Sequence, residues 1–332
     1  MQSPETFPAF ADEASLQLRS NGRLRHLLTL KGLHHDLVVE LLDAAQQFVR
    51  PTGSVAARSD SLRGRTVANL FFEPSTRTRA SFDLAGKRLG ADVLNLDVNT
   101  SSRKKGESIL DTIYTLQAMQ VDVMVVRDAS AGVPAFISQH VENHVSILNA
   151  GESDVSHPTQ GLLDLLTIRQ HFAEFAGLKV AIVGDITHSR VARSAAHGLH
   201  TMGVTDIRLI SPSALAPNRD EMPFATLTDD LDTGLQDANV VMGLRIQRER
   251  IADLDGIPDV EDYVASYGIT AARLARAAAN VVVMHPGPMN RGIEIESSLA
   301  DSARSVITQQ VTNGVAVRMA VLEHVTNALS DR

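Results

Sequence analysis

The segment Gly64–Gly90 constrains the fold of this chain more than any other, because a buried strand leads into a polar helix start. Residues 66–72 form an almost uninterrupted apolar run, which predicts a strand buried on both faces of a sheet. Pro74 ends that strand, since proline has no amide hydrogen to donate to a neighbouring strand. Residues 75–79 (STRTR) then begin a helix that is expected to end at Gly90.

The start of this helix is suited to bind a phosphate dianion. Its unpaired backbone N–H groups and the positive end of its dipole favour an anion, and a forked guanidinium adds charge-assisted hydrogen bonds. A capped helix with solvated arginines is the alternative, since capping alone accounts for the hydroxyl groups. Two threonines and two arginines crowd one turn directly after a buried strand, which favours the phosphate site.

Length and composition limit the class of protein. A chain of 332 residues exceeds one ordinary core and suggests two domains of about 150 residues. The net charge of −8 argues against a nucleic-acid partner. The absence of Cys excludes disulfides, thiolate zinc sites and cysteine nucleophiles. No apolar run approaches about 18 residues and no signal peptide precedes the fold, so we expect a cytoplasmic protein that does not enter the membrane.

Strands and helices alternate along the chain, which predicts an α/β fold of two domains, each with a mostly parallel sheet flanked by helices. Further strands are expected at 91–97, 121–127, 145–149, 178–184, 206–210, 239–244 and 281–284, and further helices at 37–49, 107–119, 134–143, 161–172 and 189–202, with a helix-like stretch at 245–251. A long C-terminal helix, 306–329, is expected to bury a face that includes Val311, Met319 and Leu322, and to return to the first domain.

The expected domains follow from this pattern. Residues 1–21 form an N-terminal extension, and residues 22–160 form the first domain together with the C-terminal helix at 305–330. Residues 161–304 form the second domain. Sites of parallel α/β sheets lie at the carboxyl ends of the strands, so polar residues that follow a strand are the candidates for function.

Four strand ends of the first half carry such residues. The first is 75–79. The second is the loop 101–107 with Lys105, for which a solvated loop is the alternative reading. The third is Arg127, which lies either at a solvated sheet rim or in a site. The fourth is the segment 157–160, where a histidine ring nitrogen and a glutamine amide precede a helix.

In the second half, arginine follows strands at two places, Arg190 and Arg245. Gln247 accompanies the second of them, and the loop 285–288 follows the last strand. Two guanidinium groups at strand ends suit a dicarboxylate ligand. The turn at 184–190 lacks G-x-G-x-x-G, so the sequence gives little support for a dinucleotide site. The chain also lacks H-E-x-x-H, an acid-rich metal cluster and a recognisable Ser–His–acid arrangement, so neither a metal nor a cofactor is expected.

Several motifs together resemble those of a known family. They are STRTR (75–79), SS-x-x-KGE (101–107), HPTQG (157–161), GD-x-x-HSRVARS (184–194), LR-x-QRER (244–250) and MHPGP-x-NRG (284–292). In this order and spacing, over roughly residues 28–329, the chain is similar to the catalytic chains of aspartate carbamoyltransferases within the aspartate/ornithine carbamoyltransferase family. Ornithine-specific members carry a Cys-containing H-C-L-P turn that this chain lacks.

The resemblance implies roles for particular residues. The groups implied to bind carbamoyl phosphate are Ser75, Thr76, Arg77, Thr78, Ser101, Lys105, Arg127, His157 and Gln160, of which Arg77, Thr78, Arg127 and His157 are implied to be catalytic. The groups implied to bind aspartate are Lys105, Arg190, Arg245, Gln247, Pro286 and Gly287. The family often has Leu at the position of Gly287, but the implied contact there is made by the main chain.

The implied reaction is transfer of the carbamoyl group from carbamoyl phosphate to the α-amine of L-aspartate, a step of de novo pyrimidine biosynthesis. The resemblance also implies a homotrimer in which Ser101 and Lys105 enter a neighbouring subunit's site. The N-terminal arm and two of the motif variants resemble members that assemble with a dihydroorotase-like partner. The alternatives are a carbamoyltransferase for another amino acid, an inactive scaffold subunit, and a phosphate-binding module with an α/β cleft.

Overall fold

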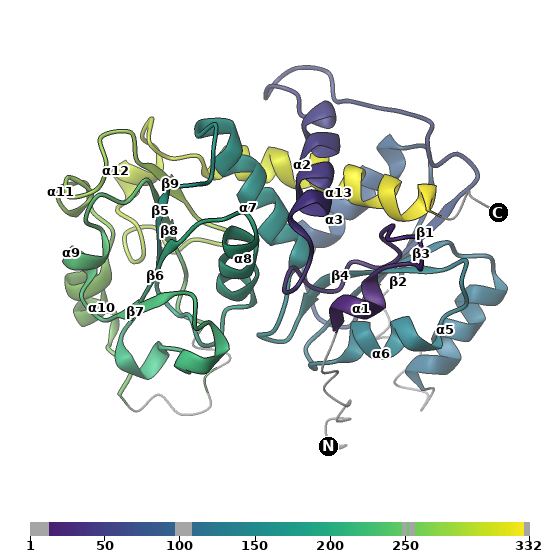
Figure 1. Cartoon of the computed structure of the whole chain (residues 1–332), viewed down its shortest axis with the longest axis horizontal. Helices are drawn as coiled ribbons and strands as arrows, with labels where there is room; N and C mark the ends of the chain where they lie inside the picture. Colours follow the sequence, from purple (N-terminus) through teal and green to yellow (C-terminus); the bar gives the residue numbers. More distant parts are fainter. Residues whose placement is uncertain (1–12, 97–107, 248–250, 252–255, 329–332) are drawn as a thin grey trace. The chain divides into compact units, whose positions relative to one another are not determined.

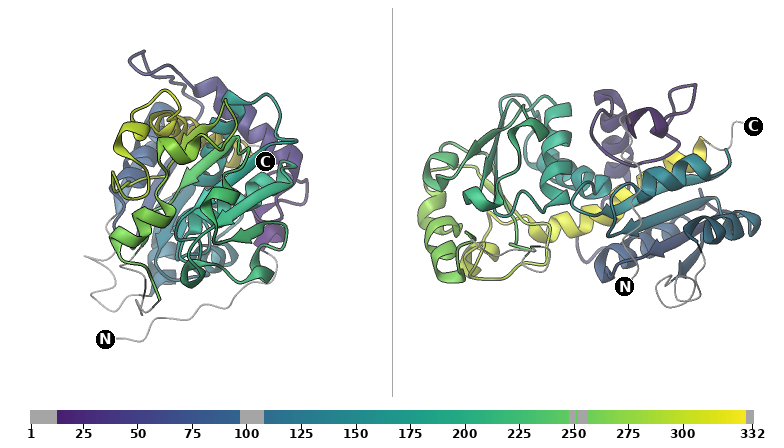
Figure 2. Two further views of the ribbon diagram at one scale, coloured as in Figure 1. Left: turned by 90° about the vertical axis from the view of Figure 1, so that its left-hand side faces the viewer. Right: turned by 90° about the horizontal axis from the view of Figure 1, so that it is seen from below.

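The computed structural model describes residues 13–96, 108–247, 251 and 256–328. The chain divides into two compact units, of which unit 1 comprises Met1–Leu163 and Thr312–Arg332 and unit 2 comprises Asp164–Val311. Each unit is built on a parallel sheet that has helices on both faces (Figures 1 and 2). The predicted fold class is therefore confirmed. Within the described part of the chain, no helix is both long enough and apolar enough to cross a membrane.

The sheet of unit 1 has the strand order β2-β1-β3-β4, and every pairing is parallel. Its strands are β1 (Thr66–Phe71), β2 (Asp92–Leu96), β3 (Val123–Asp128) and β4 (Ser146–Glu152). Because the strands are parallel, their carboxyl ends lie along one edge of the sheet. The register pairs Phe71 at the end of β1 with Arg127 near the end of β3.

Both faces of this sheet are covered. Side chains of β1 and β3 pack on one face against α5 (Ile109–Ala118) and α6 (Val133–His140) in a continuous apolar cluster. On the other face lies α3 (Thr76–Arg88), whose Phe82 is fully buried and has the Arg318 guanidinium of α13 (Ile307–Asn327) over its ring. Figure 1 shows the two pairs of helices on opposite sides of the sheet.

Unit 2 has the strand order β7-β6-β5-β8-β9, again with parallel pairings. Its strands are β5 (Lys179–Val183), β6 (Asp206–Ile210), β7 (Thr226–Thr228), β8 (Val240–Gly243) and β9 (Val282–Met284). One face is covered by an apolar cluster with α9 (Leu231–Gly234), α11 (Ala271–Leu274) and α12 (Ser297–Ala300). In Figure 1, α8 (Arg190–Thr201) lies on the other side of the sheet.

The remaining elements complete the two units. They are α1 (Glu13–Gln17), α2 (His35–Phe48), α7 (Pro158–His171), α10 (Val260–Tyr267) and two short 3₁₀ helices at Ser213–Leu215 and Arg219–Glu221. Helix α1 lies within the segment expected to be an extension. Its last residue, Gln17, is fully buried, and its side-chain oxygen accepts from the amides of Leu28 and Thr29.

Two local predictions were wrong. The stretch at 245–251 was expected to be helix-like, but the described residues 245–247 are not helical. Gln247 donates its backbone N–H to the side chain of Asp185, so this segment is held against the turn after β5. Residues 248–250 of the predicted stretch lie outside the described residues. Val311 was placed on the buried face of the C-terminal helix, yet it is 67% exposed, whereas Met319 and Leu322 on the same helix are buried as expected.

The outer edge of β4 is covered by the segment around Leu27. Leu27 donates its amide to the carbonyl of Ile147 and accepts from the amide of Asn149. Next to it, the ring nitrogen Nδ1 of the buried His26 accepts from the amide of Ile147 at 2.9 Å. Burial, with smaller contributions from the charges of Arg25 and Arg19, lowers the pKa of His26 from 6.5 to about 3. The imidazole is therefore neutral in the folded protein at neutral pH.

This depressed pKa predicts a loss of stability on mild acidification. Between about pH 6.5 and pH 3 the unfolded chain binds a proton at His26 that the folded chain does not, so the free energy of unfolding falls by about 1.4 kcal/mol per pH unit from this group as pH decreases. His26→Asn retains an acceptor for the Ile147 amide but does not titrate. Denaturant titrations at several pH values measure the free energy of unfolding of both proteins. The difference between wild type and variant should change with pH by that slope, and a difference that stays constant between pH 6 and pH 4 would refute the prediction.

Candidate active-site residues

In unit 1, the helix α3 begins directly after the strand β1 and its proline. Ser75 precedes the first helical residue with φ −159° and ψ 88°, and its side chain makes no capping hydrogen bond to the helix. The first turn contains no acidic residue, and Thr76 and Arg77 are exposed. The capping explanation for the hydroxyl groups therefore does not hold at Ser75, and the turn has the positive character that an anion requires.

Arg127 is directed toward the end of β1. Its Nη2 lies 2.6 Å from Oε1 of Glu73, and its Nη1 donates to the carbonyl of Ala150 at 3.1 Å. The Arg127 side chain is only 12% exposed, so it is not a solvated rim residue. Glu73 was not predicted for the site, although an acid directly after a buried strand and before STRTR was a usable signal.

His157 and Gln160 lie at the start of α7 and are nearly buried, with exposed fractions of 5% and 8%. The carbonyl of His157 accepts from the amides of Gln160 and Gly161, which closes the first turn of this helix. The preceding loop is held by paired backbone hydrogen bonds between Glu152 and Ser156.

The loops after β3 and β4 are also joined to each other. The amide of Ser153 donates to the carbonyl of Asp128, and the buried Glu152 carboxylate accepts from the Gly132 amide at 2.5 Å and from Asn149 Nδ2 at 2.8 Å. The structure thus brings residues 75–78, Arg127 and 157–160 to the carboxyl ends of three adjacent strands. Ser101 and Lys105, which were also predicted for this site, lie outside the described residues.

In unit 2, the turn after β5 and the segment after β8 approach each other closely. Gly184 has φ +133°, and a Cβ placed there would lie 2.4 Å from the carbonyl oxygen of Leu244. Only glycine fits this position, because both the conformation and the contact exclude a side chain. The main chains that carry Arg190 and Arg245 are therefore adjacent at this edge of the sheet.

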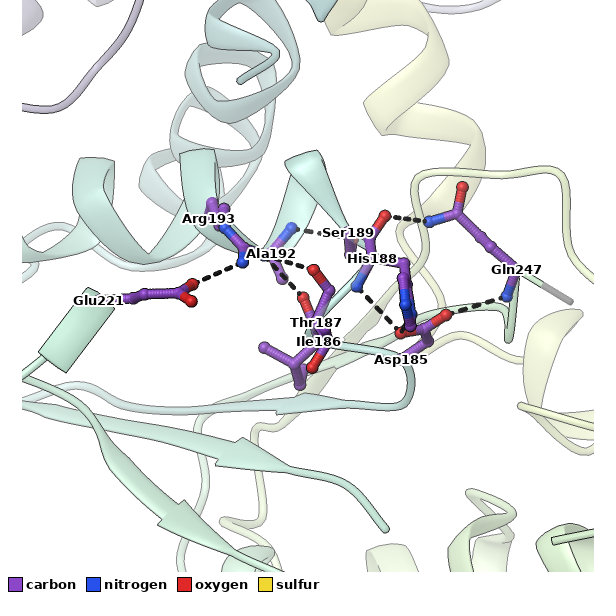
Figure 3. Close-up of polar contacts among 9 residues, drawn as sticks. All are labelled: Asp185, Ile186, Thr187, His188, Ser189, Ala192, Arg193, Glu221 and Gln247. Atoms are coloured by element: carbon purple, nitrogen blue, oxygen red, sulfur yellow. Dashed lines mark hydrogen bonds and ion pairs between the residues drawn. The ribbon is translucent and has the colours of Figure 1, made fainter. Parts of the chain in front are cut away.

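The buried carboxylate of Asp185 holds these two segments together. Its Oδ1 accepts from the amide and from the ring Nδ1 of His188, at 3.1 and 2.9 Å, and its Oδ2 accepts from the amide of Gln247 at 3.1 Å. The side-chain Nε2 of Gln247 returns a hydrogen bond to the carbonyl of His188 at 2.8 Å. Figure 3 shows these contacts, which position Gln247 beside the turn that begins α8.

Arg190 is the first residue of α8 and is 5% exposed. The helix start is formed by Ser189, whose hydroxyl accepts from the Ala192 amide at 3.1 Å. Arg193 fixes the same turn, since its Nη1 donates to the carbonyls of Ile186 and Thr187 and its Nη2 pairs with Glu221 (Figure 3). The motif GD-x-x-HSRVARS contains Asp185, His188 and Arg193, but only Arg190 was predicted from it as a site residue.

The loop after β9 is the third predicted part of the second-half site. The amide of His285 donates to the side chain of Gln310, whose Nε2 in turn donates to Asp164. The amide of Gly287 donates to Nδ1 of His285 at 2.8 Å, and Gly287 has φ +64°. Since an amine is a donor, a contact of this loop with an amino group would use its carbonyl oxygens. In the described part of the chain, no cluster of three or more His, Asp and Glu side chains is arranged to hold a metal ion.

Two domain models of one protein family match the two halves of the chain. The carbamoyl-P binding domain of aspartate/ornithine carbamoyltransferases matches residues 25–170, and the Asp/Orn binding domain of the same family matches residues 176–325. The chain belongs to the aspartate/ornithine carbamoyltransferase family. The resemblance inferred from the motifs is therefore confirmed.

Solved carbamoyltransferase structures are similar over most of the chain. Aspartate transcarbamoylase from Trypanosoma cruzi, in complex with N-(phosphonacetyl)-L-aspartic acid, is 30% identical with a TM-score of 0.81, covering 93% of this chain and 98% of that chain. The same enzyme in complex with carbamoyl aspartate and phosphate is 31% identical with a TM-score of 0.80, covering 91% and 95%. Ornithine carbamoyltransferase from Thermus thermophilus is 25% identical with a TM-score of 0.79, covering 91% and 99%.

Proposed function

We propose that this carbamoyltransferase uses L-aspartate as its acceptor and produces N-carbamoyl-L-aspartate and phosphate. The observation that carries the proposal is the joining of the turn before Arg190 to the segment of Arg245 by the Asp185 carboxylate. Two guanidinium groups on joined segments suit a substrate with two carboxylates. The similarity to an aspartate transcarbamoylase solved with carbamoyl phosphate and aspartate supports the same acceptor.

In this proposal, unit 1 holds carbamoyl phosphate. The phosphate group binds at the start of α3, with Ser75, Thr76 and Arg77 as its partners. The carbamoyl oxygen gains negative charge as the amine attacks the carbonyl carbon, and donors aimed at that oxygen contribute about 10²–10³ each to the rate. Thr78, Arg127 and His157 are the donors, and Gln160 contacts the same end of the substrate. Glu73 and the carbonyl of Ala150 hold the guanidinium of Arg127 at the carboxyl end of β3.

The acceptor is held by residues of unit 2. Arg190, Arg245 and Gln247 bind the carboxylates of aspartate, and the main chain at Pro286 and Gly287 accepts from the amino group. The departing phosphate takes up the amine proton, and Arg77 offsets the charge that develops on it. Catalysis is then orientation and charge stabilisation without a covalent intermediate.

The proposal predicts strong selectivity between acceptors. L-Aspartate should support phosphate release from carbamoyl phosphate, and L-ornithine should give at least about 100-fold lower kcat/KM, because its cationic side chain would face arginines at like-charge cost. The measurement is phosphate release with each amino acid as acceptor, with L-asparagine as a neutral control of similar size. Comparable turnover of aspartate and ornithine would contradict the assignment.

We also propose that the enzyme is a cytoplasmic homotrimer in which each active site uses Ser101 and Lys105 of the neighbouring chain, and that a dihydroorotase-like protein joins it in a larger assembly. A closed ring of three chains satisfies such a contact for every chain alike. The support is the motif SS-x-x-KGE, together with membership of the family.

The shared site predicts complementation between two inactive variants. Arg77→Ala and Lys105→Ala chains are unfolded, mixed and reassembled. Any mixed trimer then has one site with Arg77 of one chain and Lys105 of its neighbour both intact, so hybrids should regain about one third of wild-type activity. Each variant reassembled alone is the control. Hybrid trimers as inactive as both controls would exclude the shared site.

A further inference from the structure

Unit 2 contains a cavity of about 160 Å³ behind the segment that carries Arg245. Arg245 lines it together with Tyr263 of α10 and with Asn290 and Glu294 of the loop after β9, and Ile246 and Ile293 supply apolar walls. The cavity thus joins Arg245 to the same loop that contains Pro286 and Gly287. The role of its polar residues is not explained by the sequence motifs.

Glu294 is the most unusual residue of this cavity, because it is a carboxylate with only 1% of its surface exposed. Its Oε2 accepts from the amide of Asn290 at 2.9 Å, which closes the loop 290–294. Its Oε1 is buried and makes no hydrogen bond with any other residue that the structure describes. A buried carboxylate oxygen of this kind is costly unless a donor or a positive charge compensates it.

Arg245, which lines the same cavity, carries the positive charge that bears on this carboxylate. Burial raises the pKa of Glu294, while the backbone hydrogen bonds and the charge of Arg245 oppose this shift and favour the ionised form. On the other side, burial and the charges of Glu294 and Asp185 raise the pKa of Tyr263, so the phenol stays protonated as a donor. The guanidinium of Arg245 has donors on more than one edge, so it can bind two carboxylates at once.

We propose that Glu294 is a positioning residue for Arg245, whose guanidinium turns one edge to Oε1 of Glu294 when another edge binds a carboxylate of the acceptor. The inference rests on the proposed function, because it assumes that Arg245 binds the acceptor. Because Glu294 also accepts from the amide of Asn290, the same carboxylate connects Arg245 with the loop that is proposed to accept from the amino group. In that state Glu294 holds the side chain of Arg245, while Asp185 holds the main chain two residues further on, at the amide of Gln247.

A positioning role and a simple charge effect predict opposite results for Glu294→Gln. Gln can still accept from the Asn290 amide, but it lacks the charge that orients the guanidinium. If Glu294 positions Arg245, the KM for L-aspartate rises about tenfold while kcat and the KM for carbamoyl phosphate change less than about threefold. If Glu294 only reduces the positive charge at the site, removal of its charge tightens aspartate binding.

Glu294→Asp supplies the second test, because it keeps the charge and withdraws the carboxylate by one methylene. Positioning predicts a raised KM for aspartate in this variant too, whereas a charge effect predicts wild-type kinetics. Glu261→Gln, an exposed acid at the start of α10, is the matched control and should behave as wild type. An unchanged or lowered KM for aspartate in Glu294→Gln overturns the inference, while a wild-type enzyme inactive with aspartate would overturn the proposed function instead.

Discussion

The hydrogen bonds of the buried Asp185 carboxylate are the contact on which the proposed acceptor site depends. They join a turn after β5 to a segment after β8, and these two segments carry Arg190, Arg245 and Gln247. A carboxylate without exposed surface requires its partners, because an unpaired buried charge costs several kcal/mol. The donors of His188 and Gln247 therefore stabilise the fold of unit 2 and the geometry of the site together.

In unit 1, the candidate site residues are brought together by the pairing of strands. There the parallel register already places the ends of β1 and β3 side by side, so that Arg127 meets Glu73 without a long connecting loop. The turn that we propose to bind the phosphate follows β1 directly, at the proline and the start of α3.

The sequence predicted the features that depend on local patterns. The buried run before STRTR became β1 and the polar turn became the start of α3, because strand burial and proline act within a few residues. The pairing of Asp185 with Gln247 joins residues 62 positions apart and leaves no periodic signal, so the sequence did not predict it, and the helix-like stretch predicted at 245–251 is not helical at its described residues 245–247. Val311 fits the helical period of the C-terminal helix, but which positions of that period are covered depends on the tertiary neighbours. Glu294 lies between two isoleucines, and this local pattern alone does not show that the acid is buried at a cavity.

A double-mutant cycle between Asp185→Asn and Arg245→Ala tests most directly whether Asp185 acts by holding the acceptor segment. The measured quantity is kcat/KM for L-aspartate, with Asp220→Asn, an exposed acid, as the control substitution. If the account is right, Asp185→Asn lowers kcat/KM at least about tenfold in the wild-type background and much less when Arg245 is absent, giving a coupling energy above about 1 kcal/mol. Additive effects, within about 0.5 kcal/mol, would contradict it.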